Sequence, residues 1–372
     1  MRSRLGLGPV VVLVAATTLA APEDFRQAMT PWSFEYPRDH GSHEDFAIEW
    51  WYLVGHLDLA DGRTLPYQAT FFRTALDLPG STAGRSSELA AHSSIMFHGA
   101  VCDPAAQTFV SKRRVGRAAA GWAHASTERL DVHLFADRLR QVGSDRWELR
   151  YAVEGWELEL SYLLDRPPVM HGERPGLSRK GPPGHASHYV SRVQLPTSGR
   201  VKAPGGEWEK VTGISWFDQE FMTILLSDLQ VGWDWFSANL DDGSALMLYQ
   251  LREQDGGITA QSSGSFVHPD GRSEHLKLAD FTIEPTGSWT SPHTGGTYPQ
   301  GWRLSVPKLA LELTVEPLLA DQEQAHPGAP IIYWEGGCRY VGKRSGKPIV
   351  GRGHVELVGY AKPMSLPRVS AR

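Results

Sequence analysis

One β-hairpin pattern occurs twice in this chain and limits what the chain can fold into. The first copy is residues 49–57 (EWWYLVGHL), Asp61-Gly62 and residues 67–73 (YQATFFR), and the second is residues 233–240 (WDWFSANL), Asp242-Gly243 and residues 248–252 (LYQLR). Each run alternates and is rich in aromatic and β-branched residues, and Asp-Gly supplies the positive φ that a hairpin turn needs. We therefore predict two copies of one β-domain, each opening with this hairpin.

Two later blocks recur in the same order. They are the strand pair near Trp147 and residues 156–162, repeated at Trp302 and residues 311–315, and the closing pair at residues 189–195 and 211–220, repeated at 331–335 and 350–357. Three blocks in one order favour an internal duplication over a chance likeness of generic β-patterns. We expect an N-terminal β-barrel domain at residues 36–225 and a C-terminal one at residues 226–362.

Composition agrees with an all-β fold built around two cores. The 372 residues are enough for two domains, 41% are hydrophobic, and glycine (38), proline (25) and tryptophan (13) are plentiful. A formal net charge of −5 and the lack of a basic patch with interleaved aromatics argue against a nucleic-acid partner. An antiparallel barrel of about eight strands can hold one small ligand inside.

The N-terminus has the pattern of a cleaved secretory signal. Arg2 and Arg4 precede an apolar run over residues 5–20 that ends in small residues. An uncleaved anchor is the alternative, but a spanning helix needs about 20 apolar residues. We expect a periplasmic or secreted protein, in which Cys102 and Cys338 either pair or remain two separate half-buried thiols.

No motif in the chain predicts a cofactor. The sequence contains no dinucleotide fingerprint, P-loop, zinc-protease helix or serine-nucleophile elbow in a suitable context. His40, His43, Glu44 and Glu49 offer metal-ligand chemistry, but their spacing on a loop is weak, and we interpret the loop as solvated and hydrogen-bonding. The long loop at residues 171–188 is interpreted as a lid or rim.

The two hairpins place aromatic and polar side chains on one strand face. Trp50, Tyr52, Val54 and His56 share a face of the first hairpin, and Trp233, Trp235, Ser237 and Asn239 share the matching face of the second. Flat apolar walls with a few polar groups suit a ligand cavity inside a barrel, although such aromatics could simply fill two cores. The expected ligand contacts are Trp50, Tyr52, His56, Trp216, Trp233, Trp235, Asn239 and Tyr249.

The sharpest chemical feature is residues 216–220 (WFDQE). On a strand Asp218 and Glu220 point the same way, with Gln219 opposite. Two carboxylates in an apolar site raise one pKa and so provide a proton donor near neutral pH. Asp234 is a third candidate for acid–base work, and a solvated barrel rim that binds nothing is the alternative.

These motifs resemble the carotenoid 1,2-hydratase (CrtC) and AttH-like family. The resemblance rests on residues 38–41 (RDHG), 49–57, 232–252 and 333–336 (YWEG), and it extends over nearly all of residues 36–360. It implies two tandem lipocalin-like antiparallel β-barrels. It also implies chemistry of the kind found in the family, where hydratases add water to a terminal double bond of acyclic carotenoids and relatives are cofactor-free cyclases. Asp218 carries over onto the family's acidic position, whereas Gln219 stands where the family commonly has histidine, which puts hydratase activity in doubt.

We therefore expect a secreted protein that binds an apolar isoprenoid or polyene, with no cofactor or metal. If it is an enzyme, it is a hydro-lyase, or a cofactor-free cyclase or isomerase. Asp218 would be the proton donor and Glu220 or Asp234 would activate water. The alternatives are a non-catalytic carrier or sensor of a hydrophobic ligand and a structural partner module. The expected partners are a hydrophobic small molecule and, peripherally, a membrane surface.

Overall fold

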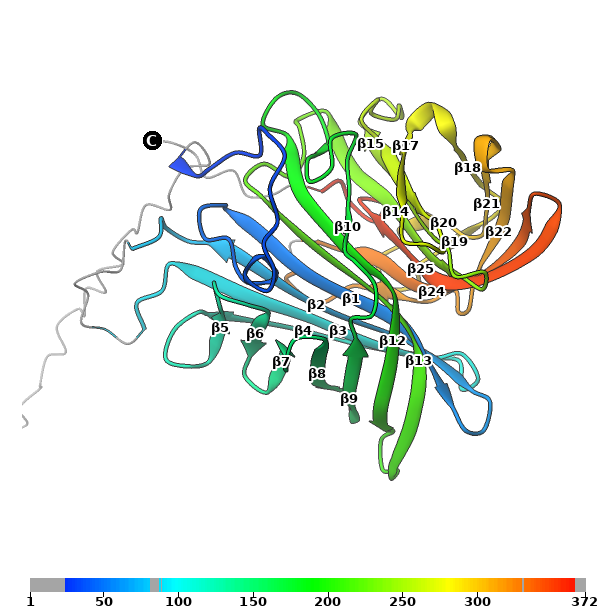
Figure 1. The fold of residues 1–372 in the computed structure, drawn as a ribbon. Helices are drawn as coiled ribbons and strands as arrows, with labels where there is room; N and C mark the ends of the chain where they lie inside the picture. Colours follow the sequence, from blue (N-terminus) through cyan, green and yellow to red (C-terminus); the bar gives the residue numbers. More distant parts are fainter. Residues whose placement is uncertain (1–23, 81–86, 88, 330, 365–372) are drawn as a thin grey trace, which may run out of the picture.

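The protein is an all-β structure made of two large antiparallel sheets, each curled into a nearly closed barrel (Figure 1). The computed structural model describes residues 24–80, 87, 89–329 and 331–364. The expected secretory signal at residues 1–20 lies outside these residues. Within the described ranges, no helix has both the length and the apolar character needed to cross a bilayer.

The first sheet contains thirteen strands. Its strands are β1 (Ile48–Leu59), β2 (Thr64–Ala75), β3 (Ser93–Asp103), β4 (Thr108–Arg117), β5 (Ala123–Ala125), β6 (Asp131–Leu134), β7 (Asp137–Gln141), β8 (Arg146–Val153), β9 (Trp156–Leu163), β10 (Val169–Met170), β11 (Ser178–Arg179), β12 (Ala186–Lys202) and β13 (Trp208–Met222). The order across the sheet is β4-β3-β2-β1-β13-β12-β9-β8-β7-β6-β5, with β10 and β11 paired to β12. A 3-10 turn, η2 (Arg38–His40), precedes β1.

The second sheet contains ten strands. They are β14 (Gln230–Leu240), β15 (Ala245–Glu253), β16 (Ser263–Val267), β17 (Ser273–Lys277), β18 (Thr282–Pro285), β21 (Trp302–Val306), β22 (Leu311–Pro317), β23 (Glu323–Gln324), β24 (Tyr333–Arg344) and β25 (Lys347–Val358). The order is β17-β16-β15-β14-β25-β24-β22-β21-β18, with β23 paired to β24. A separate ribbon joins β19 (Ser288–Thr290) to β20 (Thr297–Pro299), and two 3-10 turns are η3 (Leu278–Asp280) and η4 (Pro307–Leu309).

The two sheets have the same strand order, which confirms the predicted duplication. β1 and β2 correspond to β14 and β15, and the closing strands β12 and β13 correspond to β24 and β25. The Trp147 and Trp302 segments, β8 and β21, occupy the same place in the two orders. The predicted hairpins are present, with Gly62 and Gly243 at positive φ in their turns.

Both barrels are filled by their own side chains, which corrects the expectation of a hollow barrel. In β1 one face, including Trp51, Leu53 and Leu57, belongs to a core that draws on strands from β1 to β13. In β14 the face of Phe236 and Ala238 belongs to a second core inside the other barrel. Because side chains alternate across a strand, the opposite faces of β1 and β14 point out of the barrels.

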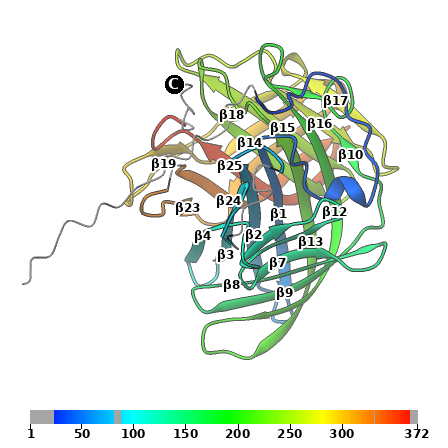
Figure 2. The same cartoon turned by 90° about the vertical axis from the view of Figure 1, so that its left-hand side faces the viewer.

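These outer faces pack against each other and join the two barrels. Tyr52 and Val54 of β1 share a buried cluster with Trp235 of β14 and Met247 of β15. Tyr52 Oη also donates a hydrogen bond of 2.8 Å to Glu335 on β24. Figure 2 shows β1 and β2 running beside the strands of the second sheet. The aromatic faces recognised in the sequence therefore line an interface between barrels.

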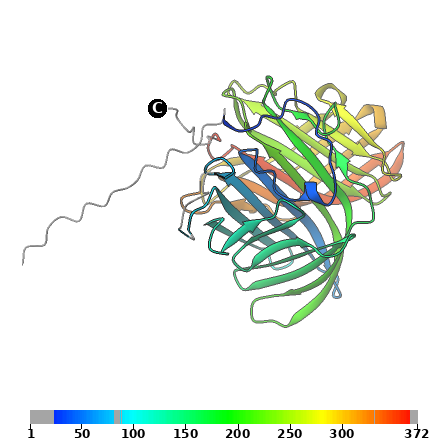
Figure 3. The ribbon, with the colours of Figure 1, turned by 60° about the vertical axis from the view of Figure 1, so that its left-hand side comes forward.

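Residues 26–35 form an extended strap (Figure 3, dark blue) that leads into η2, where His40 packs against Trp147 and Phe217 of the first core. Trp32 packs its ring edge-on against Phe46 and Phe221, at centroid distances of 5.9 and 5.3 Å. Its backbone N–H donates to Gly176 O in the loop between β10 and β11. The strap thus packs against the β10–β12 region, which contributes to the candidate site.

Candidate functional site

The candidate site is a pocket between the two barrels, at the ends of β1, β13 and β14. It contains about 660 Å³ of space free of atoms, part of it open to solvent. Its lining residues are Trp50, Tyr52, Gln68, Thr70, Phe72, Lys180, Tyr189, Asp218, Glu220, Leu225, Leu226, Trp233, Trp235, Tyr249, Leu251 and Glu356. Both barrels contribute aromatic walls, and carboxyl groups lie among them.

Asp218 is buried and held by three donors from the first barrel. Tyr189 Oη donates to Oδ2 at 2.6 Å, Trp216 Nε1 donates to Oδ1 at 2.6 Å, and Ser191 Oγ also donates to Oδ1. Burial raises the pKa of Asp218 to about 7, although the three hydrogen bonds oppose this shift. Asp218 is therefore a carboxyl group that can carry a proton near neutral pH while facing an aromatic pocket.

Glu220 lies beside Asp218 on the same face of β13 and is paired with a cation. Lys180 Nζ is 3.3 Å from Glu220 Oε1, and the two side chains are only 7% and 5% exposed. Burial raises the pKa of Glu220, and the ammonium of Lys180 opposes that rise. The same ammonium lies 4.6 Å from the centroid of the Tyr249 ring. Lys180 comes from the loop that was interpreted as a lid or rim, and it forms part of the pocket wall.

Sequence reasoning missed two carboxyl groups of the second barrel. Glu356 lines the pocket, and its Oε2 accepts a hydrogen bond of 2.9 Å from Trp233 Nε1. Burial, with repulsion from Glu220, raises the pKa of Glu356 to about 7. Glu335 on β24 lies directly opposite Glu356 on β25 and accepts a hydrogen bond from Tyr52. The signal that could have found Glu356 was the duplication, because residues 350–357 had been matched to the strand that carries Asp218.

The structure brings most of the predicted site residues together. Asp218, Glu220, Trp50, Tyr52, Trp233, Trp235 and Tyr249 all line the pocket. Trp216 does not line the pocket, but its indole N–H donates to Asp218, which does. The pocket is therefore assembled from the predicted strand faces, although it lies between the barrels rather than inside one.

Three predicted residues lie away from the pocket. Asp234 is on the opposite face of β14 from Trp233 and Trp235, where Arg252 Nε lies 2.9 Å from Oδ1 and Tyr360 Oη donates to Oδ2. His56 and Asn239 are on the expected faces but farther along their strands. There His56 Nε2 donates to Gly353 O at 2.9 Å. Asn239 accepts a hydrogen bond from the backbone N–H of Gln194 and donates one to Ser215 O. These three side chains fasten the barrels and their interface.

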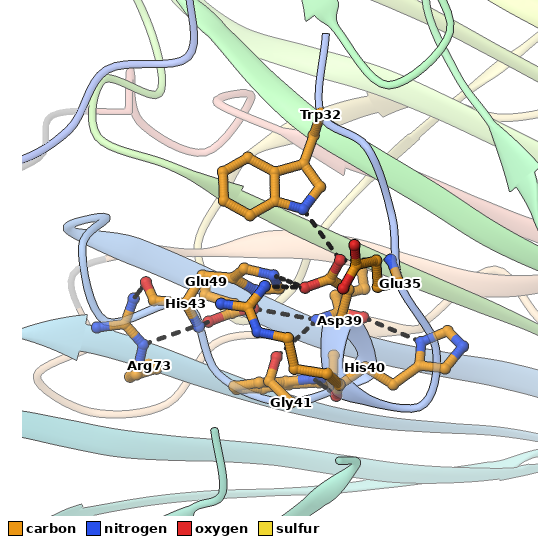
Figure 4. Close-up of polar contacts among 11 residues, drawn as sticks. Trp32, Glu35, Asp39, His40, Gly41, His43, Glu49 and Arg73 are labelled. Carbon is orange, nitrogen blue, oxygen red and sulfur yellow. Dashed lines mark hydrogen bonds and ion pairs between the residues drawn. The ribbon is translucent and has the colours of Figure 1, made fainter. Parts of the chain in front are cut away.

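A second buried polar cluster lies under the strap and is shown in Figure 4. His43 bridges two carboxylates, with Nδ1 2.8 Å from Glu49 Oε1 and Nε2 3.2 Å from Asp39 Oδ1. Asp39 also accepts from Trp32 Nε1 at 3.1 Å, and Arg73 Nε lies 3.4 Å from Glu49 Oε2. The prediction of a solvated loop is wrong here, because Asp39, His43 and Glu49 are all buried.

Gln219 belongs to this cluster and not to the pocket. Its Nε2 donates to Glu49 Oε1 and to Gly41 O, both at 3.0 Å, and its Oε1 lies 3.2 Å from His40 Nδ1. The histidine expected at this position from the resemblance would therefore stand in the cluster under the strap and not in the pocket wall. Over the described residues, no group of three or more His, Cys, Asp or Glu side chains is arranged to hold a metal ion.

The two cysteines are both buried and are not bonded to each other. Burial raises the pKa of the Cys102 thiol to about 12. Of the two expected arrangements, the structure shows two separate thiols, and both are buried rather than half-buried.

The fold and the pocket define a class of protein: two tandem lipocalin-like barrels with an acid-containing aromatic pocket between them. The AttH-like family model matches residues 27–360, and the chain belongs to this family. An AttH protein from Nitrosomonas europaea has a similar structure, with 34% identity, a TM-score of 0.78, and coverage of 90% of this chain and 100% of that one. No curated protein matches the chain.

More distant structures share the fold. Kievitone hydratase from Nectria haematococca has 15% identity and a TM-score of 0.68, with 93% of this chain and 99% of that chain covered. CghA has 11% identity and a TM-score of 0.55, with 94% and 97% covered, and its complex with Sch210972 gives 10% and 0.56 over the same shares. At these identities the likeness concerns the architecture alone.

Proposed function

We propose that this protein binds a small apolar alkene, of the isoprenoid or polyene class, in the pocket between the barrels and adds water across its C=C bond. The observation that carries the proposal is Asp218, a buried carboxyl with a pKa raised to about 7 in an aromatic pocket. General-acid catalysis is most efficient when the pKa of the acid lies near the working pH.

The chemistry divides into two steps. The Asp218 carboxyl transfers its proton to one alkene carbon, a C–H bond forms, and the neighbouring carbon becomes cationic. The faces of Trp50, Trp233 and Trp235 stabilise this cation. A water oxygen then forms the C–O bond and loses one proton to a carboxylate, so that the net change is the addition of one water molecule.

The shared architecture supports this proposal in a limited way. Kievitone hydratase carries a hydratase function in its name and has the same fold. The fold can therefore host such an activity, while the argument for this chain rests on its own pocket. Asp234 drops out as the water-activating residue because it faces Arg252 on the other side of β14.

The test uses two readouts. Native mass spectrometry of protein isolated from its own host, together with displacement of the neutral dye N-phenyl-1-naphthylamine, reports binding. Hydration of geraniol and farnesol in H₂¹⁸O, followed by mass spectrometry, reports turnover. We expect Asp218→Asn to keep dye binding and lose ¹⁸O incorporation.

The competing function is a non-catalytic carrier, which the closely packed aromatic walls also suit. A carrier would bind the dye and the alkenes without incorporating ¹⁸O. Turnover by Asp218→Asn equal to that of the unmodified protein would exclude Asp218 as the proton donor. No bound compound and no dye displacement would count against both functions.

A further inference from the structure

The duplication places a second carboxyl group where the first barrel has Asp218. In the β1–β13 pairing Asp218 is opposite Tyr52, and in the β14–β25 pairing Glu356 is opposite Trp235. Tyr52 and Trp235 hold the same position in the repeated hairpin, two residues after Trp50 and Trp233. Asp218 and Glu356 are therefore equivalent positions of the two copies.

Both carboxyl groups line the same pocket, one from each barrel. Each is held by an indole N–H, from Trp216 for Asp218 at 2.6 Å and from Trp233 for Glu356 at 2.9 Å. A ligand between the barrels is thus faced by an acidic group from each half of the molecule.

The surroundings of Glu356 contain acids and phenols. Glu220 on β13, Glu335 and Tyr333 on β24, and Tyr52 on β1 are the titratable groups that interact with it. Asp218 in turn interacts with Glu220, Tyr189, Tyr52, Glu335 and Lys180. The cation of this set, Lys180, is hydrogen-bonded to Glu220.

This arrangement separates the roles of the carboxyl groups. The ion pair with Lys180 holds Glu220 in a fixed position and opposes the rise in its pKa that burial causes. Among the described residues, Trp233 is the one side chain seen donating to Glu356, so Glu356 keeps acceptor capacity toward the pocket. Glu356 is better placed than Glu220 to accept a proton from water.

We propose that Glu356 is the second acid–base group of the pocket and works as a pair with Asp218. Asp218 gives its proton to the alkene carbon, and Glu356 takes the proton that the attacking water releases. Exchange with solvent then returns Glu356 to the carboxylate and Asp218 to the acid, which balances the cycle. The chemistry of this inference rests on the proposed function. The placement of Asp218 and Glu356 in one pocket rests on the geometry alone.

The test measures dye binding and turnover separately. The affinity for N-phenyl-1-naphthylamine is measured from pH 5.5 to 8.5 for the unmodified protein, Glu356→Gln, Asp218→Asn and the control Glu316→Gln, a change at an exposed position of β22. Charging the pocket wall disfavours an apolar ligand, so we expect the affinity of the unmodified protein to fall about tenfold or more with rising pH. Over the same pH range, we expect the dye affinity of Glu356→Gln to fall about threefold less than that of the unmodified protein. The control should show the same fall as the unmodified protein.

Turnover of geraniol in H₂¹⁸O gives the second readout. We expect Glu356→Gln to lose about 100-fold in rate while dye affinity at pH 5.5 stays within twofold. A pH dependence of dye affinity that Glu356→Gln leaves unchanged, or a rate equal to that of the unmodified protein, overturns the inference. If Glu356→Gln does not fold, Glu356→Asp, which shortens the side chain by one methylene, replaces it in the turnover assay alone, where a rate equal to that of the unmodified protein again overturns the inference.

The two proposals fail in different ways. If the unmodified protein hydrates no alkene but Glu356→Gln and Asp218→Asn both reduce the pH dependence of dye affinity, the hydratase proposal is wrong. The two groups then still form an acid–base pair facing the ligand.

Discussion

Replacing Asp218 with asparagine should change how the stability of the protein depends on pH. The folded-state pKa of Asp218 is raised from 3.8 to about 7, so the folded protein holds a proton that the unfolded chain has released between these values. The contribution of Asp218 to the unfolding free energy therefore falls as pH rises from about 4 to about 7 and is level above that range. The contribution of this one group is about 4 kcal/mol, at 1.36 kcal/mol for each unit of pKa.

The measurement is urea unfolding followed by tryptophan fluorescence at pH values from 4 to 8.5. The carbonyl oxygen of asparagine can still accept, but its NH₂ group cannot, so the variant loses the bonding on one side of the carboxyl, from Tyr189 or from Ser191 and Trp216. Because the amide does not titrate, it adds nothing to the pH dependence. We expect the drop in unfolding free energy between pH 4 and 8 to be smaller by about 4 kcal/mol in Asp218→Asn. Asp145→Asn, at an exposed turn, is the control. Equal slopes for the unmodified protein and Asp218→Asn would refute the argument that burial keeps this carboxyl protonated.

Three further changes test the pocket and the cluster under the strap. Lys180→Met leaves Glu220 buried without its cation and should cost about 3 to 5 kcal/mol of unfolding free energy; Lys180→Met combined with Glu220→Gln should recover at least half of that loss in the same urea assay. Trp233→Phe removes the donor to Glu356 and part of the aromatic wall, so the dye affinity should fall about tenfold. The control Trp122→Phe changes a residue that is 52% exposed and should leave the dye affinity unchanged. Gln219→Ala should cost about 1 to 3 kcal/mol of stability by leaving Glu49 short of a donor, and a change in dye affinity there would contradict its assignment to the cluster under the strap.

The strand pattern of this chain was readable from the sequence because β-structure has a period of two. The alternation in residues 49–57 and 233–240 correctly predicted hairpins, and the recurrence of the Trp147 block at Trp302 predicted a second barrel of the same order. The same alternation placed Asp218 and Glu220 together and Gln219 on the opposite face.

What the period cannot give is which face of a strand points into a barrel. Trp50 and Trp51 are both aromatic, so hydrophobicity alone does not say which of them is enclosed. The structure puts Trp51 in the barrel core and Trp50 in the pocket between barrels. That choice depends on how two barrels pack, which is a long-range property. The burial of His43 and Glu49 was missed for the same reason, since His43 is enclosed by Trp32 and by Phe221, which is distant in the sequence.

The hydrogen bonds that cross between the barrels make the site a joint product of both halves. Tyr52 of the first barrel reaches Glu335 of the second, and Trp235 of the second reaches Tyr189 of the first at 3.0 Å. In a symmetric dimer of one barrel, both sides of such a cavity would carry the same residues. Because the two copies lie in one polypeptide, matching positions are free to differ, and serine stands at position 191 where the other copy has Glu335. The unequal walls of the cavity are thus possible because the copies are fused.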